Sequence, residues 1–341
     1  MLKRQVYRMP KAGSIKELIL QTEELPAPGP GEVCVGVKAI GLNFADIFAM
    51  QGLYKATPAG SFIPGLEFSG EVIAVGAGVT DRKVGDRVMG ATKFGGYVSH
   101  LNIDHRYVIP LPEGWSFEEG AGFIVQGLTA YYALTALGNL QQGIAVLIHS
   151  AAGGVGIMAN RICKKYGAYT IGTVGSPRKV PFLQEEEGYD DVIVRDKHFP
   201  QKLQKALDGR PLLLVMECIG GDIFRQSWDA MAPMGRVVAY GSASFTSHTA
   251  KPDYLRLIWK FLKRPKVDPL RLPSQNKSLM GFNLIFLYEQ TEMMLEMLNQ
   301  LMALQLRPQH IGHVFPFGEM HKAINLFQLG ETMGKVVVKV D

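Results

Sequence analysis

Cysteine is scarce in this sequence, with three residues among 341: Cys34, Cys163 and Cys218. Their odd number, their wide separation and the lack of metal-site spacing argue against a disulfide framework and against a cysteine-based metal site. A signal peptide is also lacking, because residues 1–4 are followed by polar residues rather than by an apolar segment. We therefore expect free or buried thiols in a reducing compartment, and a cytoplasmic protein.

The sequence also lacks a strong net charge and an uninterrupted membrane-spanning run. Its 36 basic and 31 acidic residues give a net charge of +5 and are spread along the chain, so nothing calls for a nucleic-acid partner. Residues 121–148 carry no charged side chain and no histidine, a length that suggests a membrane span. Polar residues such as Gln126 and Thr129, and a turn at residues 138–143, interrupt this stretch. A buried helix followed by a buried strand explains it better, and we expect a soluble protein.

What the sequence does have is enough length and apolar content for two cores. At roughly 100–200 residues per domain, 341 residues of which 47% are hydrophobic suggest about two domains. The first hundred residues are rich in glycine, and strand-like runs such as residues 32–39 and 68–76 alternate with turns. This part predicts a mostly β module.

The pattern changes after residue 114. The wholly apolar run at residues 144–148 is typical of a strand in a parallel sheet that helices cover on both faces. Further strands, with helices between them, are expected at residues 169–174, 191–194 and 212–217. This is a repeated β-α-β pattern. Another helix is expected at residues 285–304, and a last strand at residues 335–340 is expected to return to the first domain.

A glycine-rich turn, residues 150–156, directly follows the apolar run and opens a helix. The dinucleotide-binding fingerprint has Ala151 at its first glycine position, Gly153 at its second and Gly156 at its third. A residue without Cβ at the second position lets the backbone approach a pyrophosphate, and the helix N-terminus offers that anion unpaired N–H groups. The strand before and the helix after favour nucleotide binding over a turn without a ligand.

The loop after the second strand of this unit discriminates between cofactors. A site for NAD usually places Asp or Glu there to hold the ribose hydroxyls. Residues 171–179 contain no acid, and Ser176, Arg178 and Lys179 occupy the loop instead. Cations would pair with a 2′-phosphate, so the loop favours NADPH. The alternative is that Arg178 and Lys179 are only the solvated start of a helix.

Histidine does not suggest a metal site. None of the eight histidines has a partner at ligand spacing near a cysteine, and His310 and His313 lie in a loop with no third ligand in view. We interpret them as surface residues and predict no metal.

These motifs together resemble the medium-chain dehydrogenase/reductase superfamily, in particular its zinc-free quinone-oxidoreductase branch (zeta-crystallin-like). The motifs that carry the resemblance are residues 41–46, 51–54, 64–70, 85–88, 151–156 and 172–176. Within that branch the chain looks most like the vesicle amine transport protein group, on residues 41–46, 81–89, 138–141 and 280–284 and on the long insert before residue 280. Zinc-dependent relatives carry ligands where this chain has Asn43 and Leu66, and their four-cysteine loop is missing here.

The resemblance implies an α/β architecture, with a GroES-like β domain (residues 1–121 and 284–341) and a Rossmann doubly wound parallel-sheet domain (residues 122–283). It also implies NADPH in the cleft and a homodimer formed through edge strands near residues 278–283. The implied cofactor-binding residues are Thr129, Ala152, Gly153, Gly154, Val155, Gly156, Gly175, Ser176, Lys179, Arg195, Gly220, Tyr240 and Gly241. Arg195 stands where family members often have Tyr, and Glu217 where Asp is more usual.

The resulting hypothesis is an NADPH-dependent reductase of a small-molecule quinone or of an activated C=C bond in an α,β-unsaturated carbonyl. In this scheme Asn43 donates a hydrogen bond to the substrate oxygen, and Tyr54 donates a hydrogen bond or a proton. The alternatives are that Asn43 supports a turn or the nicotinamide and that Tyr54 is a half-buried packing residue.

The basic insert, residues 251–277, leaves further alternatives. Its helix places Leu255, Ile258, Trp259 and Leu262 at i, i+3, i+4 and i+7 spacing among several cations. Such a helix suits peripheral contact with an anionic membrane, but packing across the cofactor cleft is the favoured interpretation. Two rival functions remain: an enoyl reductase that acts in trans on carrier- or CoA-bound chains, and an NADPH-binding membrane adaptor without turnover.

Overall fold

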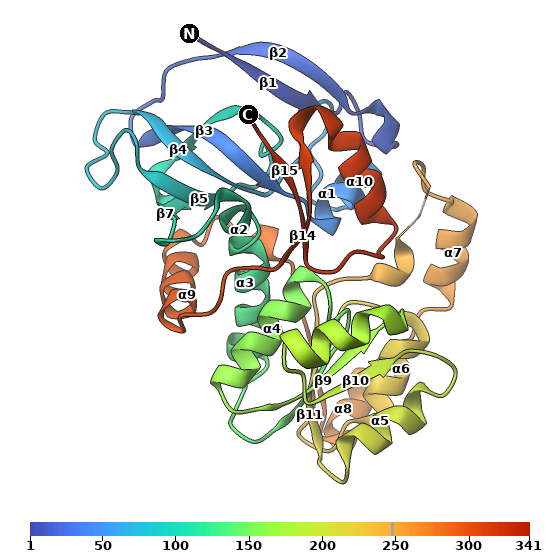
Figure 1. The fold of residues 1–341 in the computed structure, drawn as a ribbon. Coiled ribbons are helices and arrows are strands. Elements are labelled where there is room, and N and C mark those ends of the chain that lie inside the picture. The colour runs from blue at the N-terminus through green and yellow to red at the C-terminus, as the bar shows by residue number, and fades with distance from the viewer. Residues whose placement is uncertain (247–248) are drawn as a thin grey trace.

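The computed structural model describes residues 1–246 and 249–341, so His248, one of the eight histidines, lies outside the described residues. Two β-sheets, each with its own core, form the two lobes seen in Figure 1, and the chain crosses between them near its middle and again near its end. This arrangement confirms the predicted α/β fold class with a GroES-like and a Rossmann-like domain.

The GroES-like lobe is built on a seven-stranded sheet. Its main path has the order β14-β15-β3-β4-β5-β7, and β6 pairs with β3. The bounds are β3 Glu32–Gly41, β4 Glu67–Val75, β5 Arg87–Ala91, β6 His100–Asp104, β7 Val108–Pro110, β14 Ile311–Pro316 and β15 Lys335–Lys339. A hairpin of β1 (Leu2–Arg8) and β2 (Ile19–Leu25) covers it. The last strand therefore returns to the first domain, as predicted, and pairs antiparallel with β3.

The Rossmann-like lobe has six strands, all parallel, in the order β10-β9-β8-β11-β12-β13. The bounds are β8 Ala145–Ile148, β9 Tyr169–Val174, β10 Asp191–Val194, β11 Leu212–Glu217, β12 Arg236–Ala239 and β13 Ser278–Gly281. In β8, Val146 and Ile148 pack on one face of the sheet, while Ala145 and Leu147 pack on the other. Both faces are buried, which is why the strand is apolar at every position.

Helices cover both faces of this sheet. The core on one face includes residues of α3 (Ile124–Tyr131), α4 (Gly154–Lys165) and α9 (Thr291–Ala303), and the core on the other includes residues of α5 (Phe199–Leu207) and α6 (Gly221–Ala230). The uncharged stretch at residues 121–148 thus contains helix and strand, as predicted. No described helix is long and apolar enough to cross a membrane.

The remaining helices are divided between the two lobes and their boundary, with α8 far from the boundary, near α5 and α6 (Figure 1). They are α1 Phe44–Met50, α2 Phe117–Ala121, α7 Tyr254–Leu262, α8 Leu272–Gln275 and α10 Met320–Gln328. The helix expected at residues 285–304 begins only at Thr291, because residues 284–287 form a separate 3-10 turn. The domain boundaries at residues 121/122 and 283/284 stay a prediction; α9, which follows the second boundary, packs against α3.

Candidate active site between the two lobes

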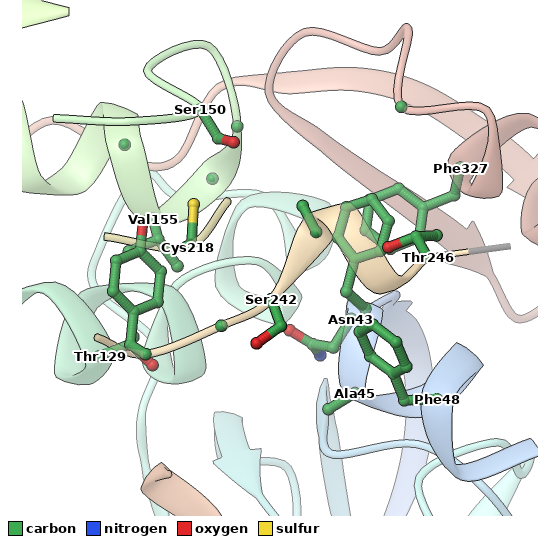
Figure 2. Close-up of a pocket in the computed structure, with 18 of the residues that line it drawn as sticks. Asn43, Ala45, Phe48, Thr129, Ser150, Val155, Cys218, Ser242, Thr246 and Phe327 are labelled. Atoms are coloured by element: carbon green, nitrogen blue, oxygen red, sulfur yellow. The ribbon is translucent and has the colours of Figure 1, made fainter. Parts of the chain in front are cut away.

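A cavity of about 1600 Å³ lies between the lobes and is lined by residues of both. Figure 2 shows Ser150, Val155 and Cys218 from the parallel-sheet side facing Asn43 and Phe48 from the β side, with Ser242 between them. Cavities for one small ligand usually measure about 300–1,000 Å³. This one is large enough for a cofactor together with a second molecule.

The glycine turn forms one wall of the cavity. Gly153 precedes the first residue of α4, and no side chain caps this helix. A Cβ on Gly153 would meet only the Ser150 carbonyl oxygen, at 3.2 Å, so the backbone here is open toward the cavity. A Cβ on Gly156 would lie 2.6 Å from the Ala151 oxygen, so this glycine lets the helix pack against the strand end. The turn fits a pyrophosphate at an uncapped helix N-terminus.

Two half-buried cations lie at the carboxyl ends of neighbouring strands: Lys179 follows β9, and Arg195 follows β10. The Arg195 guanidinium donates to Thr173 Oγ1 over 2.7 Å, and Lys179 Nζ donates to the carbonyl oxygens of Gly330 and Thr332 over 3.0 and 2.8 Å. Within the described part of the chain, neither cation has a carboxylate partner. Burial lowers the pKa of both groups, and for Lys179 the nearby Arg195 adds to this effect. Desolvated cations without counter-ions suit an anionic ligand.

Most of the residues predicted to bind the cofactor line this cavity. They are Thr129, Ala152, Gly153, Gly154, Val155, Gly156, Gly175, Ser176, Lys179, Arg195, Tyr240 and Gly241. Gly220 differs: it precedes α6 and its N–H donates to Glu217 Oε1 over 2.9 Å, while its neighbours Cys218 and Ile219 line the cavity instead.

A buried polar cluster surrounds Asn43, which lines the cavity just before α1. Its amide nitrogen donates to Gly41 O and Glu67 Oε1, at 3.2 and 3.0 Å, and its oxygen accepts from Gln126 Nε2 and Lys335 Nζ, at 2.6 and 3.1 Å. Both amide hydrogens are therefore used inside the protein. A bond from Asn43 to the substrate oxygen would therefore have to replace one of these two internal bonds, and the role of Asn43 as that donor stays a prediction.

Sequence reasoning missed Glu67, Gln126 and Lys335. A partial signal was present for two of them, since Glu67 and Lys335 are charged residues that begin strands with many apolar residues. Such positions indicate a buried ion pair, but the sequence does not say which acid meets which base.

Tyr54, the second predicted catalytic residue, also lines the cavity. Its hydroxyl donates to Asn283 Oδ1 over 2.7 Å, and this bond links the β lobe to the residues after β13. Burial is the main cause that raises the pKa of Tyr54 to about 12. The phenol therefore keeps its proton at neutral pH, and its catalytic role stays a prediction.

Helix α7 of the insert lies at the edge of the cavity. Tyr254, Leu257, Ile258 and Phe261 line the cavity. Of the stripe picked out from the sequence, only Ile258 belongs to this face, while Leu255, Trp259 and Leu262 are 83, 57 and 69% exposed. The structure agrees with the favoured interpretation that the helix packs across the cofactor cleft. However, the helix face that lines the cavity is shifted by one residue from the expected stripe.

The comparisons with known proteins agree with this architecture. Residues 29–113 match the alcohol dehydrogenase GroES-like domain, and residues 154–300 match the zinc-binding dehydrogenase family. The chain belongs to the medium-chain dehydrogenase/reductase superfamily and is an oxidoreductase. Within this superfamily it is similar to quinone oxidoreductases and to VAT-1 proteins.

Two individual relatives are similar in sequence to much of the chain. The chain is 34% identical to the human synaptic vesicle membrane protein VAT-1 homolog over 317 residues, 92% of this chain and 80% of that protein. It is 38% identical to a quinone oxidoreductase of Pseudomonas aeruginosa over 218 residues, 64% of this chain and 67% of that protein.

Two solved structures are similar over nearly the whole chain. Mycobacterial Rv1454c complexed with NADPH gives a TM-score of 0.84 at 26% identity, covering 98% of this chain and 99% of that one. CurK enoyl reductase gives a TM-score of 0.81 at 30% identity, covering 99% of each chain.

Zinc, which one matching family is named for, does not fit the residues present. Lys335 Nζ, a cation, lies 3.1 Å from Asn43 Oδ1 and forms an ion pair with Glu67. No group of three His, Cys, Asp or Glu side chains able to hold a metal ion occurs among the described residues. The buried ammonium of Lys335, paired with the Glu67 carboxylate, repels a second cation at this position.

Proposed function

We propose that this protein is an NADPH-dependent, zinc-independent reductase of quinones or activated C=C bonds. The observation that carries the proposal is a pair of half-buried cations, Lys179 and Arg195, which line the same cavity as the glycine turn and form no ion pair with a carboxylate of the described residues. This pair suits the 2′-phosphate that distinguishes NADPH from NADH. The NADPH complex of mycobacterial Rv1454c supports the same cofactor.

When bound, the cofactor supplies the hydride. The chain's own residues then have to position the acceptor, exclude water and provide a proton. Leu66, Val125 and Phe282 give the middle of the cavity apolar walls. The Asn43 cluster, in which Gln126 and Lys335 donate to the Asn43 oxygen, supports Asn43 at the wall of the same cavity. Tyr54 holds a proton in the same cavity, and solvent restores it.

The test is a fluorescence titration with NADPH and NADH, followed by a quinone and enone panel in the same cuvette. We expect tighter binding of NADPH and its oxidation by one of the two acceptor classes. Equal affinity for both cofactors would contradict the assignment of the cation pair. Tight binding without turnover of any acceptor would contradict the reductase.

A specific observation favours one rival, an enoyl reductase that acts on carrier- or CoA-bound chains. The similarity to CurK enoyl reductase extends over 99% of both chains. A pantetheine-linked enoyl thioester in the panel separates this rival from a quinone reductase, because only the rival requires the thioester arm. If no acceptor is reduced, the remaining alternative is the NADPH-binding membrane adaptor without turnover.

Two further proposals concern partners. A second copy of the chain is expected to pair along β13, because this strand forms one edge of the parallel sheet and its Leu279 is 39% exposed. The outer face of α7, with Leu255, Trp259 and Leu262 beside Lys263, suits peripheral contact with an anionic membrane. Size-exclusion chromatography with light scattering tests the dimer, and liposome flotation at low salt tests the membrane contact.

A further inference from the structure

One part of the cavity is lined by α7 of the insert together with α1 and α10 of the β lobe. We call it the outer lobe and define it by six lining residues: Phe44, Phe48, Phe245, Leu257, Phe261 and Phe327. Figure 2 shows Phe48 and Phe327 on this side, away from Ser150 and Val155 of the glycine turn. None of the six has a polar atom in its side chain. Polar neighbours are few on this side of the cavity; they include Thr246, seen beside Phe327 in Figure 2, and Arg264, which lies over the Phe261 ring.

The insert makes this compartment by crossing from one domain to the other. The Thr249 carbonyl accepts hydrogen bonds from Gln51 Nε2 and Gln328 Nε2, at 3.0 and 2.7 Å, which ties the insert to the β lobe. At its other end, Trp228 Nε1 donates to Gln275 Oε1 over 3.2 Å, which ties it to α6 of the Rossmann-like lobe. Because both ends are held, α7 forms a fixed wall of the outer lobe.

Aromatic side chains in the outer lobe remain unusually open. Phe44 is 38% and Phe261 53% exposed, although both face the cavity. The Phe44 ring packs on Phe327, with centroids 4.5 Å apart, so part of this wall is already ordered. An apolar ligand that covered these rings would gain the free energy of removing them from water.

We propose that the outer lobe binds the long apolar tail of the acceptor, so that the enzyme prefers alkyl- or isoprenoid-tailed substrates to tailless ones. The assignment rests on the proposed reductase function and names its substrate class. It follows from three observations: the six residues line the same cavity as Asn43 and Tyr54, their side chains are wholly apolar, and the cavity of about 1600 Å³ exceeds the roughly 300–1,000 Å³ usual for one small ligand. A polar group at the end of the tail would meet Arg264, whose guanidinium lies 3.7 Å from the Phe261 ring centre.

The experiment measures kcat/KM with NADPH for quinones that share one ring and carry no tail, a short alkyl tail or a long isoprenoid tail. We expect kcat/KM to rise with tail length, by up to about fourfold for each methylene that becomes fully buried, until the outer lobe is filled. Leu257→Asn places an amide in the inner face of α7, and it should reduce the ratio of long-tailed to tailless kcat/KM at least tenfold. Leu255→Asn, in the same helix but 83% exposed, is the matched control and should leave this ratio unchanged.

A binding measurement separates this inference from the proposed function. Calorimetry with the reduced, unreactive tailed quinol should show a lower Kd than with the tailless quinol and a negative heat-capacity change. Tailed and tailless acceptors with equal kcat/KM, or equal effects of Leu255→Asn and Leu257→Asn, would overturn the tail site while leaving the reductase intact. If no acceptor is reduced, the proposed function fails, and the calorimetry still decides whether the outer lobe binds a tail. Equal thermal midpoints of the two variants exclude a folding defect.

Discussion

Lys335 on β15 and Glu67 on β4 form an ion pair inside the protein, with side chains only 3 and 1% exposed. The two strands flank β3 from either side, so the pair connects the last strand of the chain to the first half of the β lobe. Burial lowers the pKa of Lys335, and the nearby Glu67 carboxylate opposes that shift. The pair supports Asn43 directly beneath the cavity.

Replacing one member of this ion pair should strongly destabilise the folded protein. Lys335→Met leaves the Glu67 carboxylate buried without a counter-charge, and we expect a loss of about 3–5 kcal/mol in the free energy of unfolding. The double variant Glu67→Gln with Lys335→Met should recover a large part of that loss, because no buried charge remains. Urea unfolding measures both. Lys322→Met is the control: its pair with Glu319 is mostly exposed, and its removal should cost at most about 1 kcal/mol.

The Arg195→Ala substitution should weaken the binding of NADPH but not that of NADH. Removing a charged hydrogen-bond donor to a phosphate costs about 1.5–3 kcal/mol, so Kd for NADPH should rise roughly 10- to 100-fold, with little change for NADH. Fluorescence titration gives both constants. Arg178→Ala is the comparison, because Arg178 is 79% exposed and lies 3.9 Å from Glu331. A parallel loss of NADH and NADPH affinity in Arg195→Ala would mean that Arg195 only supports Thr173.

Tyr54→Phe tests the proton donor. If the phenol donates the proton, kcat should fall about 100-fold, within the usual range for one general acid. Because the pKa of Tyr54 is raised to about 12, the kcat of the native enzyme should show no titration of this group from about pH 6 to pH 10. Asn283→Ala removes only the partner of the hydroxyl. Stopped-flow turnover that is unchanged in Tyr54→Phe would assign the proton to solvent.

Asp46 should make stability depend on pH. Its Oδ2 accepts from Asn43 N–H at 2.8 Å and from the Tyr97 hydroxyl at 3.0 Å, and burial raises its pKa to about 7. The unfolded chain loses this proton near pH 4, whereas the folded chain keeps it until about pH 7. The free energy of unfolding should therefore decrease as pH rises across this interval, by at most about 1.4 kcal/mol per pH unit from this group.

The Asp46→Asn variant isolates that contribution. It removes the titrating group but retains an oxygen that accepts from Asn43 and Tyr97, so the difference between the two unfolding curves should vary with pH only between about pH 4 and pH 7. A constant difference across the series would show that Asp46 has an ordinary pKa.

Much of the fold followed from local patterns. The bounds of β9, β10 and β11 agree with prediction at both ends, because each strand is a short apolar run between turn residues. The helix expected from residue 285 instead starts at Thr291, since hydrophobic periodicity alone does not show that residues 284–287 turn separately. The glycines of the turn were identified for the same local reason, the absence of Cβ where backbones approach closely.

Amino-acid order by itself determined the two-domain α/β architecture, the glycine turn and the absence of an acid after β9, because each depends on neighbouring residues. Only the tertiary structure decided how distant side chains share hydrogen bonds. Lys335 reaches Asn43 across 292 positions, and this contact, with those to Gly41, Glu67 and Gln126, gives the Asn43 amide internal partners that no local pattern shows. Likewise, the periodicity of α7 showed an amphipathic helix, but which face lines the cavity depended on where both ends of the insert are held.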